Sequence, residues 1–299
     1  MRVLAAFLGV ILVWSTTPLA IKWSGEGPGY LFGVASRMVI GLICMTLALL
    51  LLKQKIPWSR AAWLTYLAIS AQIYGAMLSV YWGAQFIPSG WISVIFGLTP
   101  MMTAILAALW LKESSLSPLK LLSYASGFAG LVVMFGSALE IGPDAAFGIG
   151  AVVMSAFIQS TSSVLVKRIN AGIPAACQVT GGLLLSVPVY LATWLWLDGQ
   201  WPARLPVLSL LSIAYLGIIA TTVGFALYFY VLTRLPATRV ALITLVTPVM
   251  ALLLGNSTND EPLTPKVALG SALVMNALIL HQLSERSSKR RRLRCQTKP

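Results

Sequence analysis

The sequence is a succession of long apolar runs, each about as long as an α-helix that crosses the hydrocarbon core of a bilayer. A charged or turn-forming segment separates each run from the next, as at Lys53 to Arg60 and at Gly142 to Asp144. The runs cover roughly residues 4–22, 31–52, 61–84, 88–111, 119–139, 147–166, 175–197, 207–233, 238–256 and 265–283. Charged residues make up only 10% of the chain, against about 25% in a typical soluble domain. The sequence therefore predicts an all-α polytopic membrane protein with ten transmembrane helices.

The chain also repeats itself. Thr99-Pro100 has a counterpart in Thr247-Pro248, 148 residues further on. Three pairs of residues recur at this distance: Pro88 and Pro236, Pro100 and Pro248, and Glu113 and Glu261. Several prolines and glutamates in one register indicate an internal duplication of the kind found in transporters. We therefore expect a first five-helix unit at residues 1–140, a second at 146–284 and a basic tail at 285–299.

Basic residues predict the orientation, because cytoplasmic loops carry an excess of Lys and Arg. If the N-terminus is cytoplasmic, 17 of the 21 basic residues fall on the cytoplasmic side. The four on the outer side are Lys22, Arg37, Arg204 and Lys266. We therefore expect both termini to be cytoplasmic.

The two predicted units enter the membrane in opposite orientations, because each contains an odd number of helices. Inverted repeats of this kind are typical of alternating-access transporters, in which exchanging the conformations of the halves turns an inward-open state into an outward-open one. An enzyme requires no such symmetry. The duplication therefore favours a transporter.

The C-terminal tail is strongly basic, with seven of the 21 basic residues between Arg286 and Lys298. A cationic tail after a last apolar helix is most simply a cytoplasmic topology signal that also attracts anionic lipid headgroups. The net charge of +13 comes from this tail and from short loops between apolar runs. We therefore expect the lipid bilayer as a partner and no nucleic acid.

The sequence offers no catalytic or metal-binding constellation. It has no paired carboxylates, no glycine-rich phosphate loop and no cluster of His and Cys ligands. Cys44, Cys177 and Cys295 are too far apart for a metal site, and the one histidine, His281, is expected to be a solvated residue at a helix end. We therefore expect neither an enzyme nor a bound cofactor or metal.

The charged residues near the membrane leave the energy source open. Glu113 and Glu261 are expected at the ends of the fourth and ninth helices, where capping or a topological role is the simplest interpretation. Arg37 is the deepest charge, and it can snorkel outward, anchor packing or contact the substrate. The lack of a midplane carboxylate argues against a carboxylate-based proton antiporter. It favours facilitated transport, with coupling through ionisation of the substrate as an alternative.

Polar and aromatic side chains inside the helices are the candidates for a substrate cavity. A hydroxyl in a membrane helix often bonds only a nearby carbonyl or a neighbouring helix. However, Tyr74 and Tyr81 share one predicted helix face, and Gln159 in mid-membrane needs a partner. Tyrosine and tryptophan faces also suit flat, amphipathic molecules. The candidate cavity residues are Trp14, Thr17, Tyr74, Tyr81, Gln159, Ser163 and Tyr228.

Pro100 and Pro248 lie inside predicted helices. A proline in a helix interior removes a hydrogen bond and kinks the helix, and the threonine before each one supplies a hydroxyl that can compensate. Interrupted helices at corresponding places in the two units point to the transport pathway. We expect both prolines to act as conformational elements.

A set of short motifs lies along the two predicted units. It consists of Trp14-Ser15 with Lys22, Ser36-Arg37, the run Pro88, Thr99-Pro100, Glu113 and Ser117-Pro118, and the copy Pro236, Thr247-Pro248 and Glu261-Pro262-Leu263-Thr264-Pro265. In these motifs the chain resembles the drug/metabolite transporter superfamily, and specifically its EamA-type exporters with two five-helix units. The similarity covers residues 1–284, and the first unit departs from the usual ending through a longer turn at Ser114-Ser115-Leu116. Within the superfamily the chain is similar to the YddG-type exporters of aromatic amino acids and related compounds.

This resemblance implies ten helices, cytoplasmic termini, a bacterial inner-membrane location, and a central cavity lined by the first, third, fourth, sixth, eighth and ninth helices. It also implies export of amino acids, aromatic and other neutral ones, and of related metabolites. A proton-coupled multidrug or metabolite antiporter is the alternative within transport, and a non-transporting membrane scaffold or receptor is the alternative outside it. We expect a monomer or a weak dimer.

Overall fold

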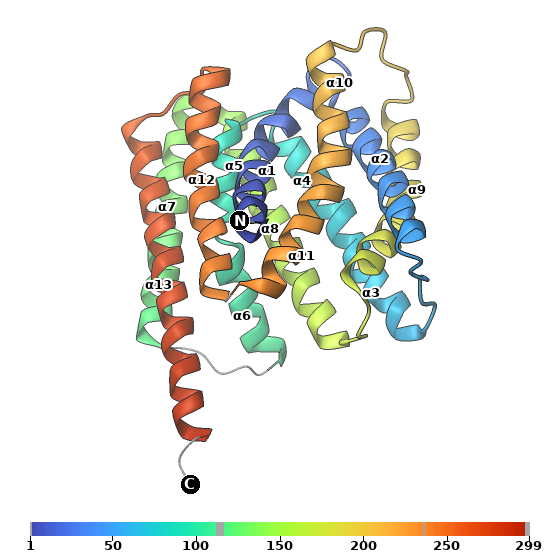
Figure 1. Cartoon of the computed structure of the whole chain (residues 1–299). Coiled ribbons are helices and arrows are strands. Elements are labelled where there is room, and N and C mark those ends of the chain that lie inside the picture. The colour runs from blue at the N-terminus through green and yellow to red at the C-terminus, as the bar shows by residue number, and fades with distance from the viewer. Residues whose placement is uncertain (1, 112–116, 236, 297–299) are drawn as a thin grey trace.

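The computed structural model of the chain is a bundle of helices (Figure 1), and it describes residues 2–111, 117–235 and 237–296. Within these residues, ten segments are long and apolar enough to cross a membrane, as the apolar runs predict. Seven spans lie on single helices: α1 (Arg2–Gly25), α2 (Tyr30–Leu51), α7 (Pro118–Ile141), α8 (Pro143–Ile169), α9 (Ala175–Leu197), α12 (Ala237–Asn259) and α13 (Pro265–Gln296). The predicted fold class is therefore confirmed for the described part of the chain.

The other three spans are divided. The third consists of α3 (Arg60–Ala71), η1 (Gln72–Ala76) and α4 (Met77–Gly83). The fourth consists of α5 (Ser89–Phe96) and α6 (Thr99–Leu111), and the eighth of α10 (Val207–Ala214), η2 (Tyr215–Val223) and α11 (Gly224–Arg234). Two of the residues that define the repeat, Glu113 and Pro236, lie outside the described residues.

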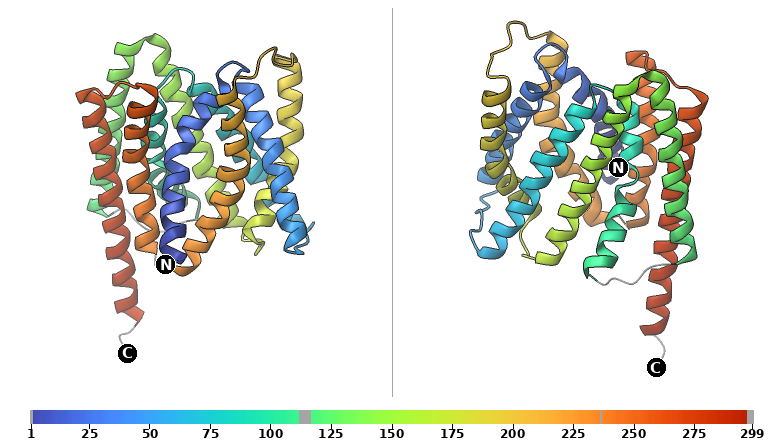
Figure 2. Two further views of the ribbon diagram at one scale, coloured as in Figure 1. Left: turned by 45° about the horizontal axis from the view of Figure 1, so that its top comes forward. Right: turned by 180° about the vertical axis from the view of Figure 1, so that it is seen from behind.

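Both ends of the chain lie on the same side of the bundle, at the bottom of the left view in Figure 2. We call this the tail side and the opposite one the distal side. The connections that follow Leu51 and Ile169 are on the tail side, whereas those that follow Gly25, Gly83 and Asn259 are on the distal side.

The surface of the bundle is apolar because it faces lipid. Leu8 and Leu12 on α1 and Leu195 and Trp196 on α9 are largely exposed. In a membrane, helices associate through close packing of small residues more than through burial of apolar area. At Gly130 on α7, for example, a Cβ atom would lie 2.7 Å from the carbonyl oxygen of Gly270 on α13. These two helices therefore touch backbone to backbone.

The two repeat-related prolines have different surroundings. In the fourth span the helix stops at Phe96, and Pro100 is the second residue of a new helix, where its missing N–H costs nothing. In the ninth span α12 runs unbroken through Pro248. The prediction that a proline lies inside a helix is therefore correct for Pro248 and wrong for Pro100, because the helix ends before Pro100 and a new one begins there.

The break in the fourth span separates two packing arrangements. On the distal side, α5 packs against α12, α1 and α8. On the tail side, α6 keeps the packing against α8 but does not pack closely against α12. The fourth span therefore lies against α12 on the distal side and moves away from it towards the tail side.

The third and eighth spans each contain a π-helical segment, η1 and η2. A π-turn inserts an extra residue into an α-helix and is common at functional sites. It also rotates the residues after it relative to those before it. The α-helical spacing that places Tyr74 and Tyr81 on one face therefore does not hold across η1.

Candidate functional site

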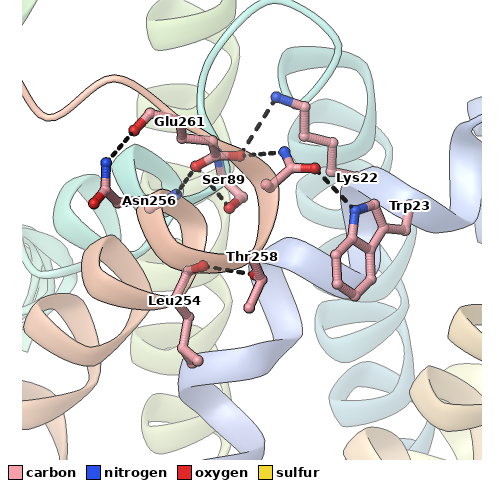
Figure 3. Close-up of polar contacts among 9 residues, drawn as sticks. Lys22, Trp23, Ser89, Leu254, Asn256, Thr258 and Glu261 are labelled. Atoms are coloured by element: carbon pink, nitrogen blue, oxygen red, sulfur yellow. Dashed lines mark hydrogen bonds and ion pairs between the residues drawn. The ribbon is translucent and has the colours of Figure 1, made fainter.

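The distal side is held together by the Glu261 carboxylate, which lies in the connection after α12 and is 7% exposed. Its Oε1 accepts hydrogen bonds from Ser89 N at 2.9 Å and from Asn259 Nδ2 at 3.0 Å. Its Oε2 accepts from Ser89 Oγ at 2.9 Å and from Gly90 N at 3.2 Å (Figure 3). Ser89 and Glu261 are 172 residues apart and come from the two predicted units.

The carboxylate caps the N-terminus of α5. The residue before that helix, Pro88, has no side-chain oxygen that could take the first free N–H groups. Glu261 supplies the acceptor from another part of the chain, and its negative charge is favourable at the positive end of the helix dipole. The expected capping role of Glu261 therefore serves a helix in the first unit and not its own.

Two further residues fix the position of this carboxylate. Asn256 Nδ2 donates to the Glu261 carbonyl at 2.8 Å and so shapes the connection after α12 (Figure 3). Gly255 leaves space for the carboxylate, because a Cβ atom at this position would overlap Glu261 Oε2. A side chain larger than hydrogen at residue 255 would thus displace the group that caps α5.

The end of α1 joins the same arrangement. Lys22 Nζ lies 3.5 Å from Glu261 Oε1, and Trp23 Nε1 donates to Asn259 Oδ1 at 3.1 Å (Figure 3). We call Lys22, Ser89, Gly90, Asn259 and Glu261 the distal closure. It ties α1 and α5 to the end of α12 through several charge-assisted hydrogen bonds.

A pocket of about 270 Å³ opens beside the distal closure. Its lining comes from the end of α1, the start of α2 and the end of the third span. The lining residues, which we call the distal pocket, are Ile21, Lys22, Gly25, Glu26, Tyr30, Tyr81, Ala84 and Gln85. Lys22 therefore belongs to both the pocket and the closure.

Arg37 lies deeper in the bundle and is 7% exposed. It does not snorkel to the surface: its Nη1 lies 3.5 Å from the Tyr81 hydroxyl, and its Nε has no hydrogen-bond partner in the described part of the chain. A buried guanidinium with one long hydrogen bond is costly in a membrane. Of the roles open to Arg37, simple snorkelling is therefore wrong.

Tyr74 and Tyr190 form a second polar group around η1. The Tyr190 hydroxyl lies 2.7 Å from the carbonyl oxygen of Ile73 and 3.0 Å from that of Tyr74, so it bonds the backbone of the π-helix. The two tyrosine rings pack at 4.9 Å, and the Tyr74 hydroxyl lies 2.8 Å from Thr193 Oγ1. The π-helix is thus stabilised by side chains of α9.

The other candidate cavity residues lie elsewhere in the bundle. Trp14 and Tyr228 pack ring to ring at 5.0 Å, between α1 and α11. The Thr17 hydroxyl donates to the carbonyl oxygen of Val13 in its own helix. This is the structural role that hydroxyls in membrane helices often have. The contacts thus place the seven residues in several groups, and their role as a substrate lining stays a prediction.

Gln159 and Ser163 belong to α8, where Ser163 donates to the Gln159 carbonyl. The exposed apolar residues Met154 and Phe157 mark the lipid side of this helix. Ser163 is exposed as well. At 100° per residue, Gln159 and Ser163 project well away from those two residues. This position is compatible with a polar surface inside the bundle.

Some residues of the candidate site could not be recognised in the sequence. Tyr190 was missed because its partners are backbone carbonyls, and Ser89 because a serine at a helix start is common. His281 is buried against Tyr124 and is not solvated, so that expectation is wrong. Among the described residues there is no group of three or more His, Cys, Asp or Glu side chains that could hold a metal ion.

The ten long apolar helical segments are those of a multi-pass membrane protein. The EamA-like transporter family matches residues 1–136 and again residues 146–281. The chain therefore belongs to the EamA-like transporter family, which consists of transporters and not enzymes.

Named relatives lie at low identity. The chain is 24% identical over 290 residues to a probable terminal-alkyne amino-acid exporter of Streptantibioticus cattleyicolor, covering 96% of this chain and 95% of that one. It is 26% identical over 203 residues to a probable amino-acid metabolite efflux pump of Escherichia coli, covering 65% and 67% of the two chains. One solved crystal structure aligns with a TM-score of 0.64 at 20% identity, over 95% of this chain and 98% of that one, and so shows the same fold.

Proposed function

We propose that this protein exports amino acids, aromatic and other neutral ones, and related metabolites across the bacterial inner membrane. Membership of a transporter family supports transport. One relative named as a probable terminal-alkyne amino-acid exporter and one named as a probable amino-acid metabolite efflux pump support the substrate class. Both termini would be cytoplasmic, so the tail side would face the cytoplasm and the distal side the outside. The basic tail would lie near anionic headgroups.

The distal closure is the observation that carries an alternating-access mechanism. It joins the two predicted units on the side that would face outward. On the tail side α6 packs on α8 and diverges from α12, which is compatible with access from the cytoplasm. The break before Pro100 lies where these two arrangements meet, and the prolines would serve as the conformational elements. Transport would then require the distal closure to open while the tail side closes.

Transport would be facilitative on this account. The carboxylates of the described residues lie in connections, near helix ends or, for Glu285, in the part of α13 beyond its apolar span, and Glu261 is already engaged in capping α5. A midplane proton carrier would need a carboxylate inside a span. The substrate gradient alone would then drive export.

The test is flux in proteoliposomes that hold the purified protein, with radiolabelled phenylalanine, threonine and methionine, and with or without a pH gradient. Saturable flux that does not respond to the gradient is the expected result. Flux that appears only with the gradient would favour the proton-coupled antiporter and would direct attention to Glu261 and His281. No flux of any of the three would refute amino-acid export and favour a scaffold or receptor.

A further inference from the structure

The distal pocket carries one charge of each sign. Lys22 lies in the last turn of α1 and Glu26 directly follows that helix, and both line the pocket. They do not pair with each other, because the ammonium of Lys22 is directed to Glu261. The Glu26 carboxylate is exposed, and no cation of the described residues lies within ion-pair distance of it. The pocket thus presents separated positive and negative groups.

Lys22 is the weakest partner of Glu261. Each carboxylate oxygen of Glu261 already accepts two hydrogen bonds of 2.9 to 3.2 Å from other donors. The Lys22 ammonium lies farther away, at 3.5 Å, and its side chain is 26% exposed. A salt bridge of this length and exposure contributes little. The ammonium can therefore change partners at small cost.

The rest of the lining suits a small organic molecule. Tyr81 lies one turn below Gln85 and is buried, and Tyr30 borders the same space from α2. Aromatic rings with a few polar groups are typical of small-molecule sites. The Arg37 guanidinium, next to the Tyr81 hydroxyl, adds positive electrostatic potential at the inner end of the pocket.

We propose that the distal pocket binds the zwitterionic head of an α-amino acid, with the carboxylate on Lys22 and the ammonium on Glu26. This inference rests on the proposed function and adds to it an exit subsite on the outer side. A substrate carboxylate in the pocket competes with Glu261 for Lys22. Occupation of the pocket therefore removes one of the contacts of the distal closure and links the arrival of substrate to its opening.

Occupancy can be measured without measuring flux. Gln85 is exposed and lines the pocket, so Gln85→Cys places a reactive thiol there. A membrane-impermeant maleimide added to right-side-out membrane vesicles reaches this thiol from outside. Cys44 lies in the tail-side half of α2, Cys177 is buried, and Cys295 belongs to the basic tail that would be cytoplasmic, so none of the three competes for the reagent. The rate of labelling is then followed with phenylalanine, threonine or methionine outside.

The expected result is protection of Gln85→Cys by at least one of the three amino acids, and much weaker protection by the same compound without its carboxylate or without its ammonium. Lys22→Gln should weaken protection at least about tenfold, because it removes a charge-assisted contact. Glu26→Gln should reduce the amino acid to the affinity of its desamino analogue. Asp260→Asn, which removes another exposed distal carboxylate, should leave protection unchanged.

Absence of protection by all three amino acids, equal protection by the uncharged analogues, or unchanged protection in both Lys22→Gln and Glu26→Gln would overturn the proposal. Protection without flux in proteoliposomes would keep the subsite and refute export, so the two failures can be told apart.

Discussion

Replacement of Glu261 by glutamine tests whether this carboxylate holds the distal side closed. The substitution keeps the shape of the side chain but removes its charge. In the native chain the two oxygens accept hydrogen bonds from four donors. The amide of Glu261→Gln has only one acceptor oxygen, and its NH₂ group faces donors. We therefore expect the closed arrangement of the distal side to become much less favourable.

The size of the effect follows from the contacts that are lost. Two hydrogen bonds lose their acceptor, at about 1 kcal/mol each. Loss of a carboxylate at the N-terminus of α5 costs up to about 1 kcal/mol more, and the partly exposed Lys22 pair adds little. The total is roughly 3 kcal/mol, which lowers the ratio of distal-closed to distal-open molecules about 100-fold.

The assay is a distance measurement between spin labels on the distal side. Gln85 just after α4 and Ser257 near the end of α12 are both exposed and suit labelling. Double electron–electron resonance on the reconstituted protein gives the populations of short and long distances. The native background should show mainly the short distance, and Glu261→Gln should show a substantial population of the long one.

Asp260→Asn is the matched control, because it removes the adjacent carboxylate, which is exposed and makes no hydrogen bond or ion pair within the described residues. Asparagine also tolerates the positive φ of 47° at this position. The control should keep the native distribution. If Glu261→Gln keeps it as well, the capping interaction does not hold the distal side closed and the reasoning is refuted.

Other substitutions test other parts of the account. Gly255→Ala should open the distal side in the same distance measurement, because its Cβ would overlap the Glu261 carboxylate, whereas Gly150→Ala on α8, with no atom within 4 Å of the added Cβ, should not. Tyr190→Phe should destabilise the protein by about 1–3 kcal/mol, because it takes a donor from buried carbonyls of η1; an unchanged unfolding temperature in detergent would contradict this. Tyr81→Ala and Gln159→Ala should change transport rates in proteoliposomes while the protein still folds, and native rates in both would refute their placement in the substrate cavity.

The membrane spans could be predicted from the sequence because bilayer thickness dictates helix length. The run at residues 31–52 corresponds to α2 at Tyr30–Leu51, and the run at 175–197 to α9 at Ala175–Leu197. Local signals such as Pro174 and Pro206 precede helices directly. These features depend on neighbouring residues only, so the sequence contains them in full.

The π-helices and the distal closure could not be predicted in this way. Hydrophobic periodicity assumes an α-helix, so it placed Tyr74 and Tyr81 on one face and overlooked the extra residue in η1. Glu261 was recognised as a repeated residue with a capping role, but its partner Ser89 is 172 residues away. Only the packing of α5 on α12 brings the two together.

The most direct test of the central claim is a reversible cross-link across the distal closure. Gln85 just after the third span and Ser257 near the end of α12 are both exposed on the distal side, and cysteines at these positions leave the contacts of the distal closure in place. A Gln85→Cys and Ser257→Cys variant would therefore tie the third span to α12 when it reacts with a short bis-methanethiosulfonate, whose disulfide bonds a reductant cleaves. We predict that cross-linking stops amino-acid flux in proteoliposomes and that a reductant restores it, while the native chain is unaffected by either treatment. Undiminished flux through the fully cross-linked protein would show that transport does not require the distal side to open.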